Sequence, residues 1–163
     1  MDVEDALAEV SLPARILSEM YEHALAREGD AEECCGLVVA SAQERFARVV
    51  RCRNVMTQKH EQDPEAWPRD NHNAYFMHPE DLRKWLEPDA AERVTAVYHS
   101  HVGVDAYLSD EDRAYVENEL FPFPDADQIV LSVHDKRVKS ARLFRRSAPG
   151  DPFVGMAIAV EHV

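Results

Sequence analysis

The sequence lacks several features that mark specialised classes of protein. No apolar run approaches the roughly 20 residues needed to span a bilayer. The first ten residues, MDVEDALAEV, are acidic where a secretory signal would carry positive charge ahead of an apolar block. The three cysteines are an odd number, and Cys34 and Cys35 are adjacent, so no disulfide framework is indicated. We therefore expect a soluble, cytoplasmic protein with reduced thiols and no membrane partner.

Positive charge and glycine are also scarce. The chain has 18 Lys and Arg against 31 Asp and Glu, a formal net charge of −13. Nucleic-acid binding needs clustered Lys and Arg that release counterions, so we expect no nucleic-acid partner. The acidic surface either meets a basic partner or maintains solubility. Only 5 glycines are present, too few for the many tight turns of a small all-β metal barrel.

The length of 163 residues predicts one domain, residues 1–163, around a single core. Apolar residues at the spacing of one helical face predict a helix over 13–28, bounded by Pro13 and Gly29. Two further helices are expected, one that begins at Pro79 and ends before Pro88 and one after Asp110. Runs rich in β-branched and aromatic residues predict strands at 34–41, 45–53, 74–78, 93–101, 128–133, 138–146 and 153–160. The strands at 128–133 and 138–146 are expected to form a hairpin joined near Asp135 and Lys136. This mixed order predicts an α/β or α+β fold, a sheet with helices on its faces.

A polar segment between the second and third of these strands, residues 54–73, is interrupted by two prolines. We expect a long loop there, and loops of this length in compact domains are often functional.

The segment AVYHSHVGVDAYLSDED, residues 96–112, carries most of the chemistry. Side chains alternate along a strand, so His99 and His101 project to one face with Ser100 opposite. Ser109 is placed to cap the next helix, and Asp112 follows one turn in. Two imidazoles and one carboxylate satisfy the three protein ligands of a catalytic zinc site. A plain strand followed by a capped, acidic helix start is the alternative.

The complete spacing is more specific: His-Ser-His, seven residues, Ser, two residues, Asp. It resembles the signature of the JAMM (MPN+) zinc metallopeptidase family, which includes ubiquitin isopeptidases and bacterial processors of ubiquitin-like sulfur carriers. Outside the signature, Glu33 precedes Gly36 as in that family, and residues 52–54 and 76–82 are also similar to it. The resemblance covers residues 13–145 and implies an MPN/JAMM fold, a cytidine-deaminase-like mixed sheet flanked by helices.

Carried over by this resemblance, His99, His101 and Asp112 are the ligands of one Zn²⁺ ion, and Glu33 is the general base. Zinc chemistry requires such a base, which takes a proton from water and delivers it to the leaving amine. Ser109 is expected to donate a hydrogen bond to the oxyanion rather than to serve mainly as a cap. The implied substrate is a ubiquitin-like protein or its conjugate, cleaved at its C-terminal tail. The bond is either an isopeptide to lysine or a peptide bond after Gly-Gly.

Two positions depart from the family pattern, because Val102 and Leu108 stand where the family usually has proline. Without proline to fix φ at these positions, the loop is expected to be looser, and no metal ligand is lost. The segment Met56–Asn73 lies where the family carries an insertion that pairs with the substrate tail as a strand, so we expect it to clamp that tail. A plain solvent loop is the alternative.

Other candidates receive structural interpretations. We expect Cys34, Cys35 and Cys52 to be inert thiols rather than nucleophiles. Glu32, Asp110 and Glu111 are expected to be solvated acids, the last two favouring a helix start. The remaining histidines considered are expected to be surface or structural residues: His60, His72, His78 and His134.

Competing functions remain from other classes. One is a metal-free MPN scaffold, although such domains generally lack the ligand set retained here. A cupin-like barrel also uses His-x-His, but the predicted helices oppose it. A metallo-β-lactamase-like site would require Asp where Gly103 stands.

Overall fold

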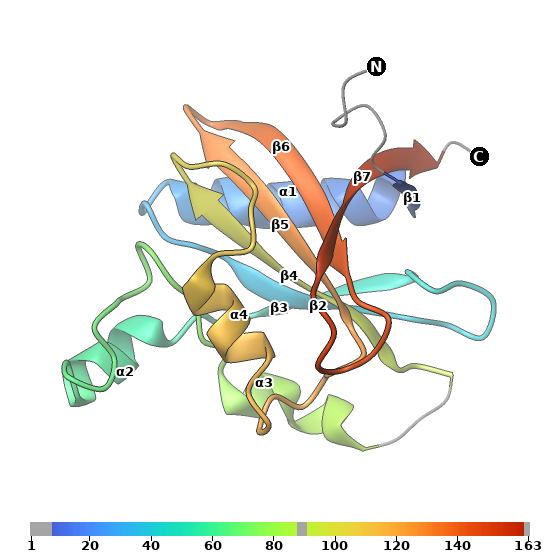
Figure 1. The fold of residues 1–163 in the computed structure, drawn as a ribbon. Helices are drawn as coiled ribbons and strands as arrows, with labels where there is room; N and C mark the ends of the chain where they lie inside the picture. Colours follow the sequence, from blue (N-terminus) through green and yellow to red (C-terminus); the bar gives the residue numbers. More distant parts are fainter. Residues whose placement is uncertain (1–7, 88–90, 162–163) are drawn as a thin grey trace.

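A computed structural model describes residues 8–87 and 91–161 of the chain. Seven strands form one mixed sheet in the order β1-β7-β6-β5-β4-β2-β3, with helices on both of its faces (Figure 1). The strands are β1 (Glu9–Pro13), β2 (Cys35–Val39), β3 (Arg48–Cys52), β4 (Val94–Val102), β5 (Asp127–His134), β6 (Arg137–Arg145) and β7 (Val154–Glu161). The helices are α1 (Ala14–Glu28), α2 (Met56–Gln62), α3 (Pro79–Leu82), the 3-10 helix η2 (Arg83–Leu86) and α4 (Asp110–Val116). The predicted mixed sheet flanked by helices is confirmed.

Helix α1 covers one face of the sheet because its apolar residues recur at helical spacing. Ile16, Leu17, Met20 and Ala24 are buried along it, between Pro13 at its start and Gly29 at its end. They pack into a core cluster with residues of β2, β4, β5 and β6. The predicted helix and its buried face are confirmed.

The opposite face carries a second core cluster, which packs under α3 and α4 (Figure 1). Strand β4 contributes to both clusters because its side chains alternate: Tyr98 packs toward α1, and Val97 packs toward the second cluster. His99 and His101 share the parity of Val97, so they face the side of the sheet that α4 covers.

Strands β4 and β5 are parallel neighbours, and α4 lies on the connection between them. Such a crossover returns the chain over the face of the sheet, which brings the start of α4 near the end of β4. The hairpin of β5 and β6 turns at Asp135 and Lys136, both with positive φ, as two-residue hairpins require. The predicted hairpin is confirmed.

Two expectations for secondary structure are wrong, and one strand was missed. The segment Met56–Gln62 forms α2 instead of a loop; the Asn54 side chain accepts a hydrogen bond from the first backbone N–H of this helix, at 3.1 Å. Residues 74–78 form only an isolated bridge, Asn54 to Met77, because side chains of Asn54 and Tyr115 bind the backbone polar groups that a ladder would use. Strand β1 was not expected, since its five residues become a strand only by pairing with the distant β7.

The helical prediction after Pro79 is confirmed, with the final turn tightened into η2. The expected stop at Pro88 lies outside the described residues. In the part of the chain that the structure describes, no helix has the length and apolar character needed to cross a bilayer.

Candidate metal centre

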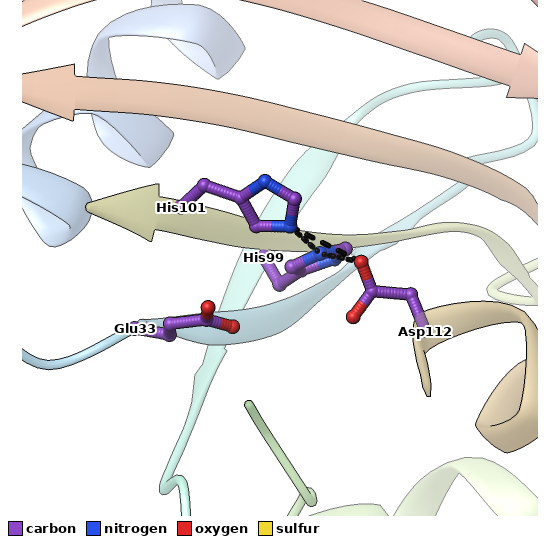
Figure 2. A group of neighbouring side chains, drawn as sticks. All are labelled: Glu33, His99, His101 and Asp112. Atoms are coloured by element: carbon purple, nitrogen blue, oxygen red, sulfur yellow. Dashed lines mark hydrogen bonds and ion pairs between the residues drawn. The ribbon is translucent and has the colours of Figure 1, made fainter. Parts of the chain in front are cut away.

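Glu33, His99, His101 and Asp112 meet on the face of the sheet under α4 (Figure 2). One potential ligand atom from each lies within 4.8 Å of those of the other three, and all four residues are buried. The residues come from three parts of the chain: the segment ahead of β2, strand β4 and helix α4. The structure therefore brings together the three expected ligands and the expected general base.

Strand alternation places the two histidines. Ser100, between them, points to the other face and accepts a hydrogen bond from the Cys34 backbone N–H at 2.8 Å. In the antiparallel pairing of β2 with β4, Cys35 lies opposite His99. Glu33 is two residues before Cys35, and so this register leads it toward His101. Long-range pairing of two strands thus delivers Glu33 to the histidines.

Helix α4 places the carboxylate of Asp112. Ser109 caps the helix: its hydroxyl oxygen accepts from the Asp112 backbone N–H at 3.1 Å, and Asp112 Oδ2 accepts from the Ser109 backbone N–H at 3.1 Å. This reciprocal capping box turns the carboxylate back toward the end of β4. Asp112 Oδ2 then lies 3.0 Å from His99 Nε2 and 3.1 Å from His101 Nε2.

The three atoms fit the ligand set of a small divalent cation. His99 Nε2 and His101 Nε2 are 3.2 Å apart, so each edge of the triangle that they form with Asp112 Oδ2 measures 3.0 to 3.2 Å. Zinc holds such ligands at about 2.0 to 2.2 Å, which separates the ligand atoms of a tetrahedral site by about 3.3 Å. Glu33 Oε1 is buried beside them without a hydrogen-bond partner among the described residues. The group can therefore bind a metal ion, with one carboxylate left over.

The electrostatics favour the metal-binding forms of two ligands. Burial alone would raise the pKa of Asp112, but the facing imidazoles His99 and His101 hold it well below its usual range. Burial lowers the pKa of His99 against the opposing pull of Asp112, so this imidazole stays neutral. An ionised carboxylate and a neutral imidazole are the species that coordinate metals.

The other two members have raised pKa values. Burial lowers the pKa of His101, but its hydrogen bond to Asp112 and the charge of Glu33 more than offset this. Burial raises the pKa of Glu33 to about 8. A carboxyl group with this pKa can take up a proton near neutral pH, which a general base must do.

Neighbouring groups that the sequence did not indicate hold the imidazoles. His101 donates through Nδ1 to the backbone carbonyl of Asp105 at 2.8 Å, and the ring of Tyr107 packs edge-on against it at 5.0 Å. Tyr75 stacks on His99 with ring centroids 4.4 Å apart. The sequence did not indicate the Asp105 contact, because a backbone carbonyl is present at every residue. It did not indicate Tyr75, because that residue lies in a segment expected to be a strand.

Ser109 differs from the expectation in one respect. We expected a hydroxyl that does not cap the helix as its main role, and the structure shows that it caps α4. The oxygen uses a lone pair for the cap, so its proton remains able to donate to another group. The oxyanion role therefore stays a prediction.

The remaining candidates lie outside the cluster. Burial raises the pKa of Cys34 and of Cys52 to about 12 and that of Cys35 well above its ordinary value, so none is a ready nucleophile. All three are free and buried, as expected. Glu32 accepts from the Asn71 side chain at 2.7 Å. The four histidines expected to be structural or on the surface are not members: His60, His72, His78 and His134.

An apolar hollow adjoins the centre. Its volume is about 740 Å³, within the range of ligand sites, and its lining includes Asp112 of the cluster and Tyr75, which stacks on His99. Helices α3 and α4 and the segment around Trp67 line it. Arg69 and Glu111 form an ion pair of 3.0 Å beside the hollow, which joins the 56–73 segment to α4.

Comparison with solved structures shows the same fold elsewhere. A solution structure of a protein from Desulfitobacterium hafniense is similar, with a TM-score of 0.58 and 18% identity over 94% of this chain and 93% of that one. A solution structure of a protein from Salinibacter ruber has a TM-score of 0.54 and 18% identity over 95% of this chain and 92% of that one. Comparison with curated proteins gave no match.

The family comparison covers most of the sequence. Residues 13–146 match the prokaryotic homologues of the JAB domain, the group to which the JAMM resemblance pointed. The match includes Glu33, both histidines of β4 and Asp112, the residues that the fold gathers into one buried group. The chain therefore belongs to the family of prokaryotic JAB-domain proteins.

Proposed function

We propose that this protein is a zinc-dependent metallopeptidase or isopeptidase that hydrolyses the amide bond at the C-terminal tail of a ubiquitin-like or sulfur-carrier protein. The observation that carries the proposal is the triangle of His99 Nε2, His101 Nε2 and Asp112 Oδ2, 3.0 to 3.2 Å on each edge. Beside it lies Glu33 Oε1, for which the described residues offer no hydrogen-bond partner. Family membership alone does not carry it, because some JAB-domain proteins are not catalytic.

Zinc is the metal that this ligand set favours. Two imidazoles and a carboxylate are the protein ligands of several catalytic zinc sites, which keep a further position for water. When bound, zinc supplies Lewis acidity, which lowers the pKa of water toward 7 and polarises the scissile carbonyl.

Glu33 then acts as the proton carrier. Its carboxylate accepts a proton from the attacking water as the new carbon–oxygen bond forms. It returns that proton to the leaving amine as the carbon–nitrogen bond breaks, so the residue ends as it began. Burial raises the pKa of Glu33 to about 8, and a divalent cation bound beside it would favour the ionised carboxylate that accepts the proton.

Ser109 is assigned to the developing oxyanion. Its oxygen accepts from the Asp112 backbone N–H, and its proton is left to donate a hydrogen bond that strengthens as negative charge builds on the carbonyl oxygen. The capping geometry holds the hydroxyl one helical turn from the Asp112 ligand, which supports this assignment.

The hollow beside the cluster is assigned to the substrate tail. Its lining includes Asp112 and Tyr75 on the side of the centre, and Trp67 and Arg69 of the 56–73 segment. A chain that lies there would bring its carbonyl to the edge of the cluster. The clamping role expected for Met56–Asn73 is part of this proposal.

The test begins with metal analysis of the purified protein. We expect about one zinc per chain, and loss of both zinc and amidase activity on chelation. The substrates are a small β-grasp protein extended by a peptide beyond its C-terminal Gly-Gly, and the same protein linked to lysine, with products identified by mass spectrometry. Stoichiometric zinc without cleavage of either substrate would favour a non-catalytic scaffold, and absence of metal binding would refute the proposal.

A further inference from the structure

The two histidines of the centre are held in different ways. Metal-binding imidazoles almost always donate their second ring N–H to an acceptor, which fixes the ring plane and the tautomer. His101 follows this rule, since its Nδ1 donates to the Asp105 carbonyl at 2.8 Å. His99 Nδ1 is buried and has no hydrogen-bond partner within the described residues. Because Nδ1 has no acceptor in the described part of the chain, another contact must fix the plane of the His99 ring.

The ring of Tyr75 stacks on the His99 imidazole. It lies 4.4 Å from the His99 ring, centroid to centroid, with an angle of 21° between the planes. Tyr75 is 2% exposed and His99 is fully buried, so the two rings are stacked away from solvent. Tyr115 packs edge-on against Tyr75 at 5.2 Å, and its hydroxyl accepts a hydrogen bond from the Met77 backbone N–H at 3.3 Å. Tyr115 therefore supports the Tyr75 ring of the stack.

We propose that Tyr75 is a positioning residue for the metal centre: its ring fixes the plane of His99 so that Nε2 faces His101 and Asp112. The outer torsion of a histidine side chain has broad minima, so an imidazole whose second ring nitrogen has no hydrogen bond needs packing to define its plane. The inference rests on the metal-binding part of the proposed function.

The hydroxyl of Tyr75 does not contribute to this role. The Tyr75 hydroxyl oxygen is buried and has no hydrogen-bond partner in the described parts of the chain. The flat ring alone should therefore suffice. This distinguishes ring stacking from a polar contact, because Tyr75→Phe keeps the ring and removes only the hydroxyl.

Zinc affinity of the full-length protein, measured by competition with a chromophoric chelator, tests the inference. We expect Tyr75→Leu to bind zinc about 10- to 100-fold more weakly, the loss typical of a removed orienting partner. Tyr75→Phe should bind as the wild type does. Cobalt substituted for zinc should give an altered visible spectrum in Tyr75→Leu and the wild-type spectrum in Tyr75→Phe.

Phe123→Leu is the matched control. Phe123 belongs to the same hydrophobic core cluster as Tyr75 and is 8% exposed. The substitution therefore also replaces a buried aromatic ring by leucine, at a position outside the metal-binding group. It should leave zinc affinity and the cobalt spectrum unchanged. Tyr75→Met serves as a second variant if Tyr75→Leu does not fold, and circular dichroism establishes the folded state of each.

The outcomes separate the two proposals. Wild-type protein that binds no zinc overturns the proposed function and this inference with it. Wild-type binding together with equal affinity and spectrum in folded Tyr75→Leu or Tyr75→Met overturns this inference alone. The inference also fails if Tyr75→Phe weakens zinc binding as much as Tyr75→Leu does, or if Phe123→Leu does so.

Discussion

At the scale of single residues, Glu33 differs from the other members of the cluster. The two histidines and Asp112 contact one another at 3.0 to 3.2 Å, whereas Glu33 Oε1 has no hydrogen-bond partner within the described residues. Burying a carboxyl without a partner costs free energy. A residue kept in this state is a functional candidate, because its raised pKa suits proton transfer more than stability.

Replacement of Glu33 by alanine should abolish cleavage and leave zinc binding and folding intact. General-base catalysis contributes about 10²- to 10⁴-fold to a rate, so we expect a loss of at least that size in kcat. Zinc content and the rate of amide hydrolysis, measured on the same preparation, check this.

Glu32→Gln is the control, since it removes the neighbouring charge while keeping an oxygen for the Asn71 side chain. It should keep wild-type activity. Turnover retained in Glu33→Ala would show that another group carries the proton.

At the scale of secondary-structure elements, α4 combines two functions in one turn. Its capping box stabilises the helix start, and the same box aims Asp112 at the histidines. The proposed oxyanion role of the Ser109 hydroxyl would be a third function of the same helical turn. Stability and catalysis at Ser109 therefore have to be separated by experiment.

Ser109→Ala should affect both. Loss of the cap should lower the free energy of unfolding by about 1 kcal/mol. Loss of the donor should raise the barrier by about 3 kcal/mol, roughly a 10²-fold decrease in kcat. Urea denaturation and steady-state kinetics measure the two effects independently.

Ser109→Gly supplies the comparison, because glycine at a cap position costs only a few tenths of a kcal/mol relative to serine. We expect it to retain most of the stability and to lose as much activity as Ser109→Ala. Full activity in the glycine variant would reduce Ser109 to a cap.

The 56–73 segment is the second element with a testable role. Trp67 lines the hollow, packs edge-on against Phe76 at 5.4 Å and carries the Lys59 ammonium over its ring at 5.5 Å. Trp67→Ala should raise KM for a protein substrate and leave zinc content unchanged, since Trp67 is not part of the cluster. Deletion of residues 58–70 should raise KM further.

Kinetics on a protein substrate and on a short peptide amide test this role. A clamp for the tail predicts a larger KM effect on the protein than on the short amide. An unchanged KM in Trp67→Ala and in the deletion variant would make the segment a plain surface structure.

At the scale of the whole molecule, His23 links stability to pH. It is buried on the side of α1 that faces β4, where its Nδ1 and the Tyr98 hydroxyl form a hydrogen bond of 2.7 Å. Burial lowers the pKa of His23 to about 4 from an ordinary value of 6.5, and the charges of Arg51 and Arg27 act in the same direction. The folded protein thus holds this histidine neutral.

The stability that a neutral His23 provides should decline as pH falls from 6.5 toward 4. In this range the unfolded chain takes up a proton that the folded protein does not, so protonation favours unfolding. At about pH 5 we expect a loss of about 1 to 2 kcal/mol relative to pH 7. Urea denaturation of the chelated protein at both pH values measures it.

His23→Gln is the comparison, because glutamine can still accept from Tyr98 and does not titrate. The variant should lose less stability than the wild type between pH 7 and pH 5. Equal losses in the two proteins would exclude His23 as the source.

Local features of the sequence sufficed for much of the fold and for the identity of the ligands. Helix α1, the β5–β6 hairpin and the shared face of His99 and His101 follow from periodicity and turn residues, which act over a few neighbouring positions. The spacing from the histidines to Asp112 also lies within one strand, one loop and one helical turn. Short-range geometry of this kind is carried by the sequence itself.

Contacts between distant segments were decided only in the tertiary structure. The register of β2 against β4 brings Glu33 to the cluster, pairing with β7 makes a strand of Glu9–Pro13, and the chain crossing from Asn54 to Met77 stacks Tyr75 on His99. None of these has a local signal, because each depends on where a second, remote segment packs. The sequence thus indicated which groups can bind a metal and, through the family resemblance, which carboxylate can assist them, and packing decided how these groups are brought together and oriented.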